Sequence, residues 1–180
     1  MCSQRSIVIN LIIMTLFWTT SSFCDYLLTF YLKYIPGNIF INTSLSVFAS
    51  LTGHASSGVV SKVFGIKIAF FVAFILASAG GLMLIFLYNA SGLVIGVFVL
   101  FAKFGCSFAF NLVYFATPQM FPAAHCGMAF GICNIIARFS TIFSPLIAEL
   151  PDPVPMTFFS AMCIGSAFMP IFLRKVKKSG

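Results

Sequence analysis

Six long apolar segments, separated by short polar turns, make up most of this sequence. They cover residues 7–32, 39–61, 68–88, 92–116, 124–146 and 156–173. A helix rises 1.5 Å per residue, so segments of this length cross a hydrocarbon core of about 30 Å. The strands of a membrane barrel are only about 10 residues long and alternate in polarity, which these segments do not. The pattern predicts an all-α, polytopic membrane protein in which residues 1–180 form a single domain of six transmembrane helices.

The composition also predicts that this chain lies in a lipid bilayer, which is then its main partner. The sequence is 61% hydrophobic and only 7% charged, whereas a soluble domain is about a quarter charged. Its net charge of +7 does not indicate nucleic-acid binding, because the few cations flank apolar segments where anionic lipid explains them. No glycine-rich phosphate loop, metal-ligand spacing or nucleophile–base set is visible. The sequence therefore predicts no enzyme activity, no cofactor and no metal site.

The cations also predict an orientation. If the N-terminus is cytoplasmic, alternate turns place nearly all of the flanking cations on the cytoplasmic side. These are Arg5, Lys62, Lys67, Arg174, Lys175, Lys177 and Lys178. Lys33 then lies outside, together with Glu149 and Asp152. The positive-inside rule thus predicts a multi-pass protein with both termini in the cytoplasm.

Three charged residues lie well inside the apolar segments: Asp25, Lys103 and Arg138. A charge at such depth costs at least a few kcal/mol, so it usually has a partner or a function. The predicted depths of Asp25 and Arg138 match, which makes an ion pair between them geometrically feasible. The functional hypothesis is a polar cavity that receives a charged or polar solute. The alternative is a structural ion pair, or side chains that extend towards the membrane surface.

Helical periodicity places further polar residues on the same faces as these cations. One face of the fourth segment carries Lys103, Ser107, Phe110 and Tyr114. One face of the fifth carries Gly127, Gly131, Asn134 and Arg138. Such faces are unlikely to contact lipid, and they predict either a water-filled cavity or close helix packing through Gly127 and Gly131.

The fourth and fifth segments carry a family resemblance. Lys103 and Phe104 match a Gly-Lys-Phe-like start, and residues 117–122 (TPQMFP) match a Thr-x-Glu-Leu-Phe/Tyr-Pro elbow. In the fifth segment, Gly131, Cys133 and Arg138 continue the family pattern without a gap. The chain resembles the C-terminal six-helix half of a major facilitator superfamily transporter. The similar branch is that of organic cation/anion transporters, which includes the synaptic vesicle glycoprotein 2 type. The resemblance implies half of that fold, built from two three-helix repeats.

The resemblance also implies a solute cavity and a substrate class. The residues expected to line the cavity are Asp25, Lys103, Asn111, Tyr114, Asn134 and Arg138. Anion-handling members of the family have an arginine at the position of Arg138, which favours a small anionic or zwitterionic organic solute. Alternating access would move it across the plasma membrane or an internal vesicle membrane.

Cytoplasmic gating motifs of the family are present in altered form. Gly58, Gly65 and Lys67 correspond to its loop motif, and Gln119 and Pro122 to its elbow. The family pattern has charged residues where this chain has Ile66, Gln119 and Cys126, and an aspartate where it has Lys62. These charges hold the inward-closed state in the family, so their replacement argues against ordinary gating.

The family has twelve spans in two halves, and alternating access needs both halves. The six segments here therefore predict a fragment or a pairing partner, either a second six-helix half or another copy of the chain. The alternative is a non-transporting membrane protein: a degenerate or partial transporter, or a subunit that binds another membrane protein.

Overall fold

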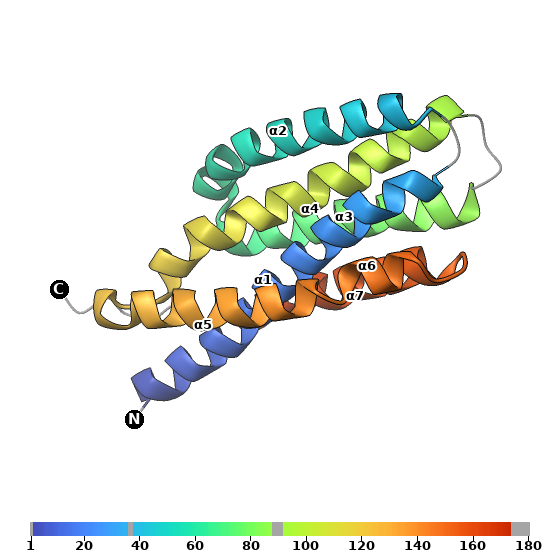
Figure 1. The fold of residues 1–180 in the computed structure, drawn as a ribbon. Coiled ribbons are helices and arrows are strands. Elements are labelled where there is room, and N and C mark those ends of the chain that lie inside the picture. The colour runs from blue at the N-terminus through green and yellow to red at the C-terminus, as the bar shows by residue number, and fades with distance from the viewer. Residues whose placement is uncertain (1, 36–37, 88–91, 174–180) are drawn as a thin grey trace.

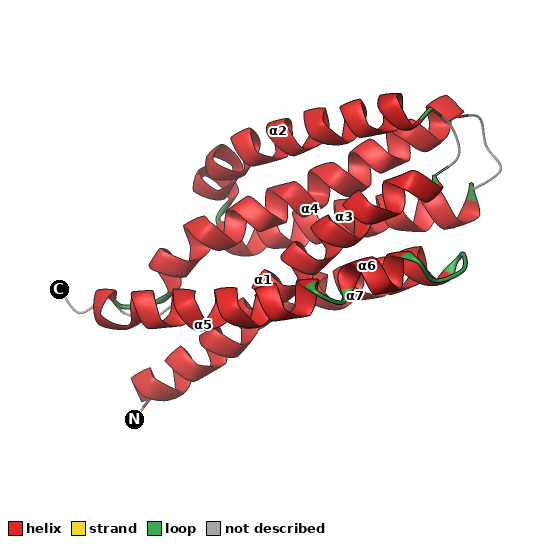
Figure 2. Cartoon of the chain, viewed as in Figure 1, coloured by secondary structure: helices red, strands yellow, loops and turns green. Residues whose placement is uncertain are grey.

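The computed structural model of this chain is a bundle of helices (Figure 1). It describes residues 2–35, 38–87 and 92–173, and within them it contains no strand (Figure 2). The helices in chain order are α1 (Cys2–Tyr31), η1 (Leu32–Tyr34), α2 (Ile39–Phe64), α3 (Ile66–Phe86), α4 (Gly92–Met120), α5 (Ala123–Thr141), α6 (Ser144–Ala148), α7 (Val154–Phe168) and η2 (Met169–Phe172). The prediction of an all-α protein is confirmed.

Five segments of the described chain are long and apolar enough to cross a membrane. They are Ser6–Tyr34, Ile66–Phe86, Val94–Met120, Ala123–Ala148 and Val154–Phe172. Six such segments were expected. The remaining helix, α2, is 26 residues long, but polar residues on its inner face, such as Asn42, Ser46 and Ser57, lower its hydropathy.

The helices pack in an interleaved order. α4 contacts α2 and α3 extensively, α1 contacts α5 and α4, and α3 also contacts α7. The consecutive helices α1 and α2 make no direct contact within the described residues. If α1–α3 form one repeat and α4, α5 and α7 form the other, then α1 corresponds to α4 and α2 corresponds to α5. The contact between α1 and α5 then corresponds to the contact between α4 and α2, which is the pairing that two three-helix repeats produce.

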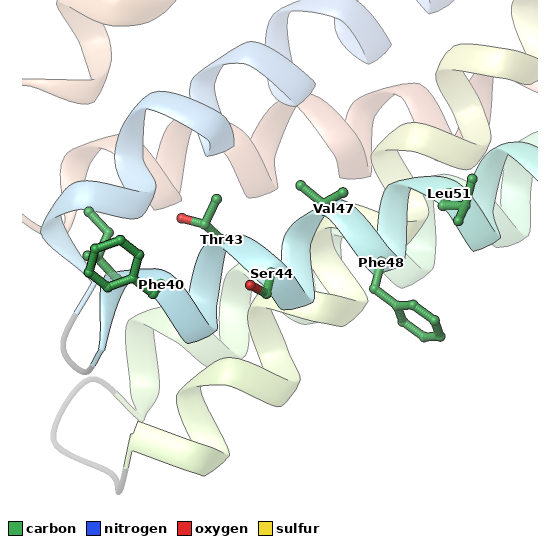
Figure 3. Close-up of a pocket in the computed structure, with 7 residues that line it drawn as sticks. Phe40, Thr43, Ser44, Val47, Phe48 and Leu51 are labelled. Carbon is green, nitrogen blue, oxygen red and sulfur yellow. The ribbon is translucent and has the colours of Figure 1, made fainter.

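The outer face of α2 is strongly apolar. Phe40 is 80% exposed and Leu51 is 67% exposed, and Figure 3 shows them with Val47 and Phe48 along this helix. The inner face of α2 holds Asn42, Ser46 and Ser57 instead. A polar inner face and an apolar outer face are unfavourable in water and favourable in lipid, so the polarity of α2 supports an integral membrane protein.

Small residues bring α3 and α4 close together. A Cβ atom added to Gly80 would lie 2.5 Å from the Ala102 nitrogen. One added to Gly105 would lie 2.5 Å from the Ala77 nitrogen and 2.7 Å from the Ala73 oxygen. In α2, a Cβ on Gly53 would lie 2.9 Å from the Phe104 oxygen, which belongs to α4. These glycines let backbones approach where no side chain fits.

The elbow between the fourth and fifth segments is shorter than predicted. We expected the fourth segment to end at residue 116 and the fifth to begin at residue 124, but α4 continues to Met120 and α5 begins at Ala123. The Thr117 hydroxyl donates to the Val113 carbonyl at 2.7 Å and accepts from the Trp18 indole at 3.1 Å. These two bonds hold the last turns of α4 in place although Pro118 lies within the helix.

The fifth segment is interrupted. We expected one helix over residues 124–146, but α5 ends at Thr141 and the short α6 begins at Ser144. Pro145 explains the break, because it lacks an N–H and its ring would clash with the carbonyl of Thr141 in a continuous helix. α7 starts at Val154 rather than residue 156, and its last turn becomes the 3-10 helix η2 around Pro170.

Gly105→Ala is expected to destabilise the bundle by about 1–3 kcal/mol, because the new methyl group meets backbone atoms of α3 that cannot move cheaply. Gly127→Ala is the matched control, since nothing lies within 4 Å of its added Cβ. The control should gain up to about 1 kcal/mol from helix propensity. Thermal unfolding of both variants in detergent micelles measures the difference, and equal midpoints would contradict the close α3–α4 contact.

Candidate functional site

A polar cluster joins three helices inside the bundle. It consists of Asp25 and Thr29 from α1, Ser50 from α2, and Lys103 and Ser107 from α4. Since the surrounding residues are largely apolar, the members of this cluster satisfy one another.

Lys103 is the centre of the cluster. Its Nζ lies 2.8 Å from Asp25 Oδ1 and donates to Thr29 Oγ1 at 2.7 Å and to the Asp25 carbonyl at 3.1 Å. An ammonium group has three N–H donors, so these contacts use all of them. The Lys103 side chain is only 7% exposed. The cation is therefore both neutralised and fully hydrogen-bonded in this conformation.

Asp25 links this cation to a second pair of hydroxyls. Its Oδ1 also accepts from Ser107 Oγ at 3.1 Å, and Ser107 Oγ lies 3.0 Å from Ser50 Oγ. The Asp25 side chain is 26% exposed, so it is only partly buried, unlike that of Lys103. The feasible Asp25–Arg138 ion pair does not form. A buried ammonium without a counter-charge is far costlier than an exposed guanidinium, and the carboxylate accordingly lies against Lys103.

Arg138 has a different environment. It is exposed on α5, and its Nη1 donates to the Tyr26 hydroxyl on α1 at 3.1 Å. All three acidic residues lie in the described part of the chain, and none has a carboxylate oxygen within 4.0 Å of the Arg138 guanidinium. Arg138 is thus a cation without a counter-charge among the described residues.

The face of α5 that carries Arg138 is open. Nothing lies within 4 Å of a Cβ placed on Gly127 or Gly131, and Asn134 on the same face is half-buried. The alternative that Gly127 and Gly131 mediate close helix packing is therefore wrong within the described chain. This face is available to water, solute or another polypeptide.

Tyr114 and Asn111, both on α4, contact different helices. The Tyr114 ring centroid lies 4.5 Å from that of Trp18 and 5.5 Å from that of Phe130, which joins α4 to α1 and α5. Asn111 Nδ2 donates to the His54 carbonyl and to Ser57 Oγ, both at 2.8 Å. Asn111 therefore ties α4 to α2, while Tyr114 belongs to an aromatic cluster.

The predicted gating residues lie at two turns. Gly65 is the single residue between α2 and α3, and its φ of 84° is a conformation that favours glycine. Lys67 Nζ donates to the Ile171 carbonyl at 3.4 Å, which connects this turn to η2. A Cβ added to Gly58 would lie 3.7 Å from the Phe115 ring. At the elbow, Gln119 is exposed and Pro122 is the N-cap residue of α5.

A second ion pair lies at the other end of the bundle. Lys33 and Glu149 approach to 3.4 Å, with side chains 50% and 61% exposed. The Tyr31 hydroxyl also donates to Asp152 in the turn between α6 and α7. These contacts attach the end of α1 to the acidic turn and involve none of the predicted cavity residues.

Two apolar hollows lie away from the polar cluster. One of about 760 Å³ runs along the outer face of α2 and includes Phe40, Ser44 and Phe48 (Figure 3). The other, of about 300 Å³, lies between α1 and α5 beside His125. Neither contains a group that could orient a charged solute as specifically as Arg138, so neither is the preferred candidate site.

Sequence reasoning missed several members of these clusters. Thr29 stands one helical turn after Asp25, a spacing that could have indicated a shared face. Tyr26, Ser50 and the Trp18–Phe130 ring contact carry no such signal, because their roles depend on which helices are neighbours.

Comparisons with known proteins identify transporters as relatives. No family model matches the chain. An inferred transporter of Caenorhabditis elegans is 23% identical to this chain over 83% of its length. Human organic cation/carnitine transporter 2 is 25% identical over 87% of the chain. A Xenopus laevis synaptic vesicle 2-related protein is 28% identical over 72% of the chain. The matches span only 30%, 28% and 24% of these relatives.

The chain is thus similar to a part of these longer proteins, which are transporters or related to transporters by name. Together with the apolar helices, they support an integral, multi-pass membrane protein.

The two ion pairs predict contrasting stability effects. Asp25→Asn should destabilise the bundle by about 3–5 kcal/mol, because it leaves the buried Lys103 cation without a counter-charge. Glu149→Gln removes the exposed pair and should cost at most about 1 kcal/mol. The double variant Asp25→Asn/Lys103→Met should recover much of the loss. Thermal unfolding in detergent tests this order, and a double variant no more stable than Asp25→Asn would refute it.

Proposed function

We propose that this chain forms the C-terminal six-helix half of a major facilitator transporter and moves a small organic ion by alternating access. The proposed branch is that of the organic cation/anion transporters and the synaptic vesicle glycoprotein 2 type. The observation that carries the proposal is Arg138, an exposed cation on the open face of α5 that has no counter-charge among the described residues. A cation held at membrane depth without a counter-charge supports the hypothesis of a functional role.

The proposed solute is anionic or zwitterionic. A guanidinium has five N–H donors and suits the planar geometry of a carboxylate, and Arg138 uses one nitrogen on Tyr26. Tyr114 and Phe130 offer partly exposed rings nearby in the α4–α5 region, and Asn134 follows the same α5 face. The proposed cavity includes Asn111, Tyr114, Asn134 and Arg138, with Asp25 at its edge and Lys103 behind Asp25.

Transport by alternating access requires a second bundle against which this one moves. The open α5 face, including Gly127 and Gly131, is the proposed contact surface. Its partner is a second six-helix half or a second copy of this chain. We also propose that all six long helices, including α2, cross the membrane and form one domain over residues 1–180.

The proposed orientation places both termini in the cytoplasm, in the plasma membrane or an internal vesicle membrane. The turn at Gly58, Gly65 and Lys67 and the elbow at Gln119 and Pro122 then face the cytoplasm and act in gating. The Lys67–Ile171 hydrogen bond supports a mechanical link between the α2–α3 turn and the last helix.

A second candidate function is a membrane protein that no longer transports, or a subunit that binds another membrane protein. Lys62, Ile66, Gln119 and Cys126 favour it, because they replace residues of the family's gating motifs. Retention of an unneutralised Arg138 favours transport, since a purely structural helix would gain stability by losing this cation.

Uptake of labelled organic anions and cations into cells that express the chain tests the leading proposal. Arg138→Ala should reduce anion uptake at least tenfold, because a hydrogen bond to a charged group contributes about 1.5–3 kcal/mol. Arg138→Lys should retain part of it, and Lys33→Ala, at the exposed pair, is the control. Absence of anion uptake from well-expressed, membrane-inserted protein would favour the second candidate.

Tyr26→Phe should weaken solute binding without changing the maximal rate. The phenol oxygen accepts from Arg138 Nη1, so its removal frees the guanidinium to adopt other rotamers. We expect a rise of about threefold to tenfold in KM for anions, the usual effect of one hydrogen bond. Tyr34→Phe, an exposed tyrosine in η1, is the matched control. An unchanged KM would show that Tyr26 does not position Arg138.

A further inference from the structure

We infer that Asp25 determines the charge specificity of the solute site: by neutralising Lys103 it makes the site select monoanions over dianions. This inference rests on the proposed function, since it concerns the solute that Arg138 binds. It assigns Asp25 and Lys103 a role in selectivity that does not require either side chain to contact the solute.

The geometry separates the three charges into a pair and a single cation. Asp25 and Lys103 are 2.8 Å apart, and Lys103 is buried with all its donors occupied. Arg138 lies on another helix and is held by Tyr26, the residue next to Asp25. Tyr26 thus connects the two sites through one stretch of α1.

No other charge of the described spanning segments alters this balance. Lys33, Lys62 and Lys67 lie within one turn of a helix end, at the membrane surfaces. From the helices around the pair, the facing polar groups are the hydroxyls of Thr29, Ser50 and Ser107, which are uncharged. The three charges inside the spans therefore leave one net positive charge.

A site with one net positive charge neutralises one anionic group. A second anionic group on the same solute would lose its hydration at partial membrane depth without gaining a cation, which is unfavourable. Without Asp25, the Lys103 cation would lack its counter-charge and would attract that second group. The carboxylate of Asp25 is accordingly the element that excludes dianions.

The charge of the pair can be changed in either direction. Asp25→Asn leaves two net positive charges in the spans, and Lys103→Met leaves none. Asp25→Asn/Lys103→Met restores a single one, on Arg138, without the ion pair. Preference for a dianion should follow this net charge and not the presence of either side chain.

The test measures binding of labelled benzenesulfonate and benzenedisulfonate to the full chain in lipid nanodiscs. Both probes stay ionised at any working pH, and their rings are the same, so the ratio of their Kd values reports charge alone. Wild type should prefer the monosulfonate. Asp25→Asn should shift the ratio towards the disulfonate by about tenfold, the effect of one added charge several ångströms away at an intermediate dielectric.

Lys103→Met should weaken binding of both probes, and the double variant should return the ratio to within about twofold of wild type. Lys33→Met, which changes the same charge at the exposed outer turn, is the control and should leave the ratio unaltered. If Asp25→Asn does not fold, the comparison of Lys103→Met with the double variant still isolates the Asp25 charge.

The outcomes separate the two proposals. The anion-binding site proposed at Arg138 is refuted if wild type binds neither sulfonate, or if Arg138→Gln leaves the Kd values of both sulfonates unchanged. Either result also refutes the inference. If binding depends on Arg138 but the ratio is the same in wild type, both single variants of the pair and the double variant, only the inference about Asp25 is refuted.

Discussion

The buried cation of Lys103 imposes the strongest constraint on this structure. An ammonium group in a lipid-surrounded bundle needs a counter-charge and a partner for each N–H, because no water is available to supply them. Asp25 and Thr29 supply these partners from a single face of α1, one turn apart. The position of α1 against α4 is therefore set by electrostatics, and Ser107 and Ser50 extend the same constraint to α2.

Close backbone contact makes this arrangement attainable. Gly80 and Gly105 allow α3 and α4 to meet at the distance of backbone atoms, and Gly53 does the same for α2 and α4. Lipid tails are as apolar as leucine, so a large apolar side chain at these positions would gain little and would separate the helices. Contact through small residues keeps Ser50 within hydrogen-bond distance of Ser107, and the apolar side chains are left for the lipid-facing surface, as on α2.

The fold was largely predictable, because the length and apolarity of a segment determine a membrane helix almost by themselves. The break at Pro145 was missed, since a proline near the end of an apolar run shortens it less visibly than one in the middle. Asp25 and Arg138 were both identified as significant, but their pairing was wrong. Sequence gives the depth of a side chain along its helix, and the rotation of α1 that turns Asp25 towards Lys103 depends on neighbours that only the fold reveals.

Polar side chains in the interior of the bundle have hydrogen-bond partners, whereas Arg138 on the exposed face of α5 lacks a counter-charge among the described residues. This difference explains why the polar residues of this chain have different roles. Asn111, Ser107 and Lys103 bond to neighbouring helices, so their polarity is used within the bundle. Arg138 bonds to one phenol and otherwise lies exposed on a helix face where a Cβ added to Gly127 or Gly131 would have no atom within 4 Å. Removing the first group should loosen the bundle, whereas under the proposed function the removal of Arg138 should mainly affect solute binding. An open cation on a stable scaffold is the arrangement that a site for a mobile anion requires, because rigid neighbours hold the guanidinium ready without neutralising it.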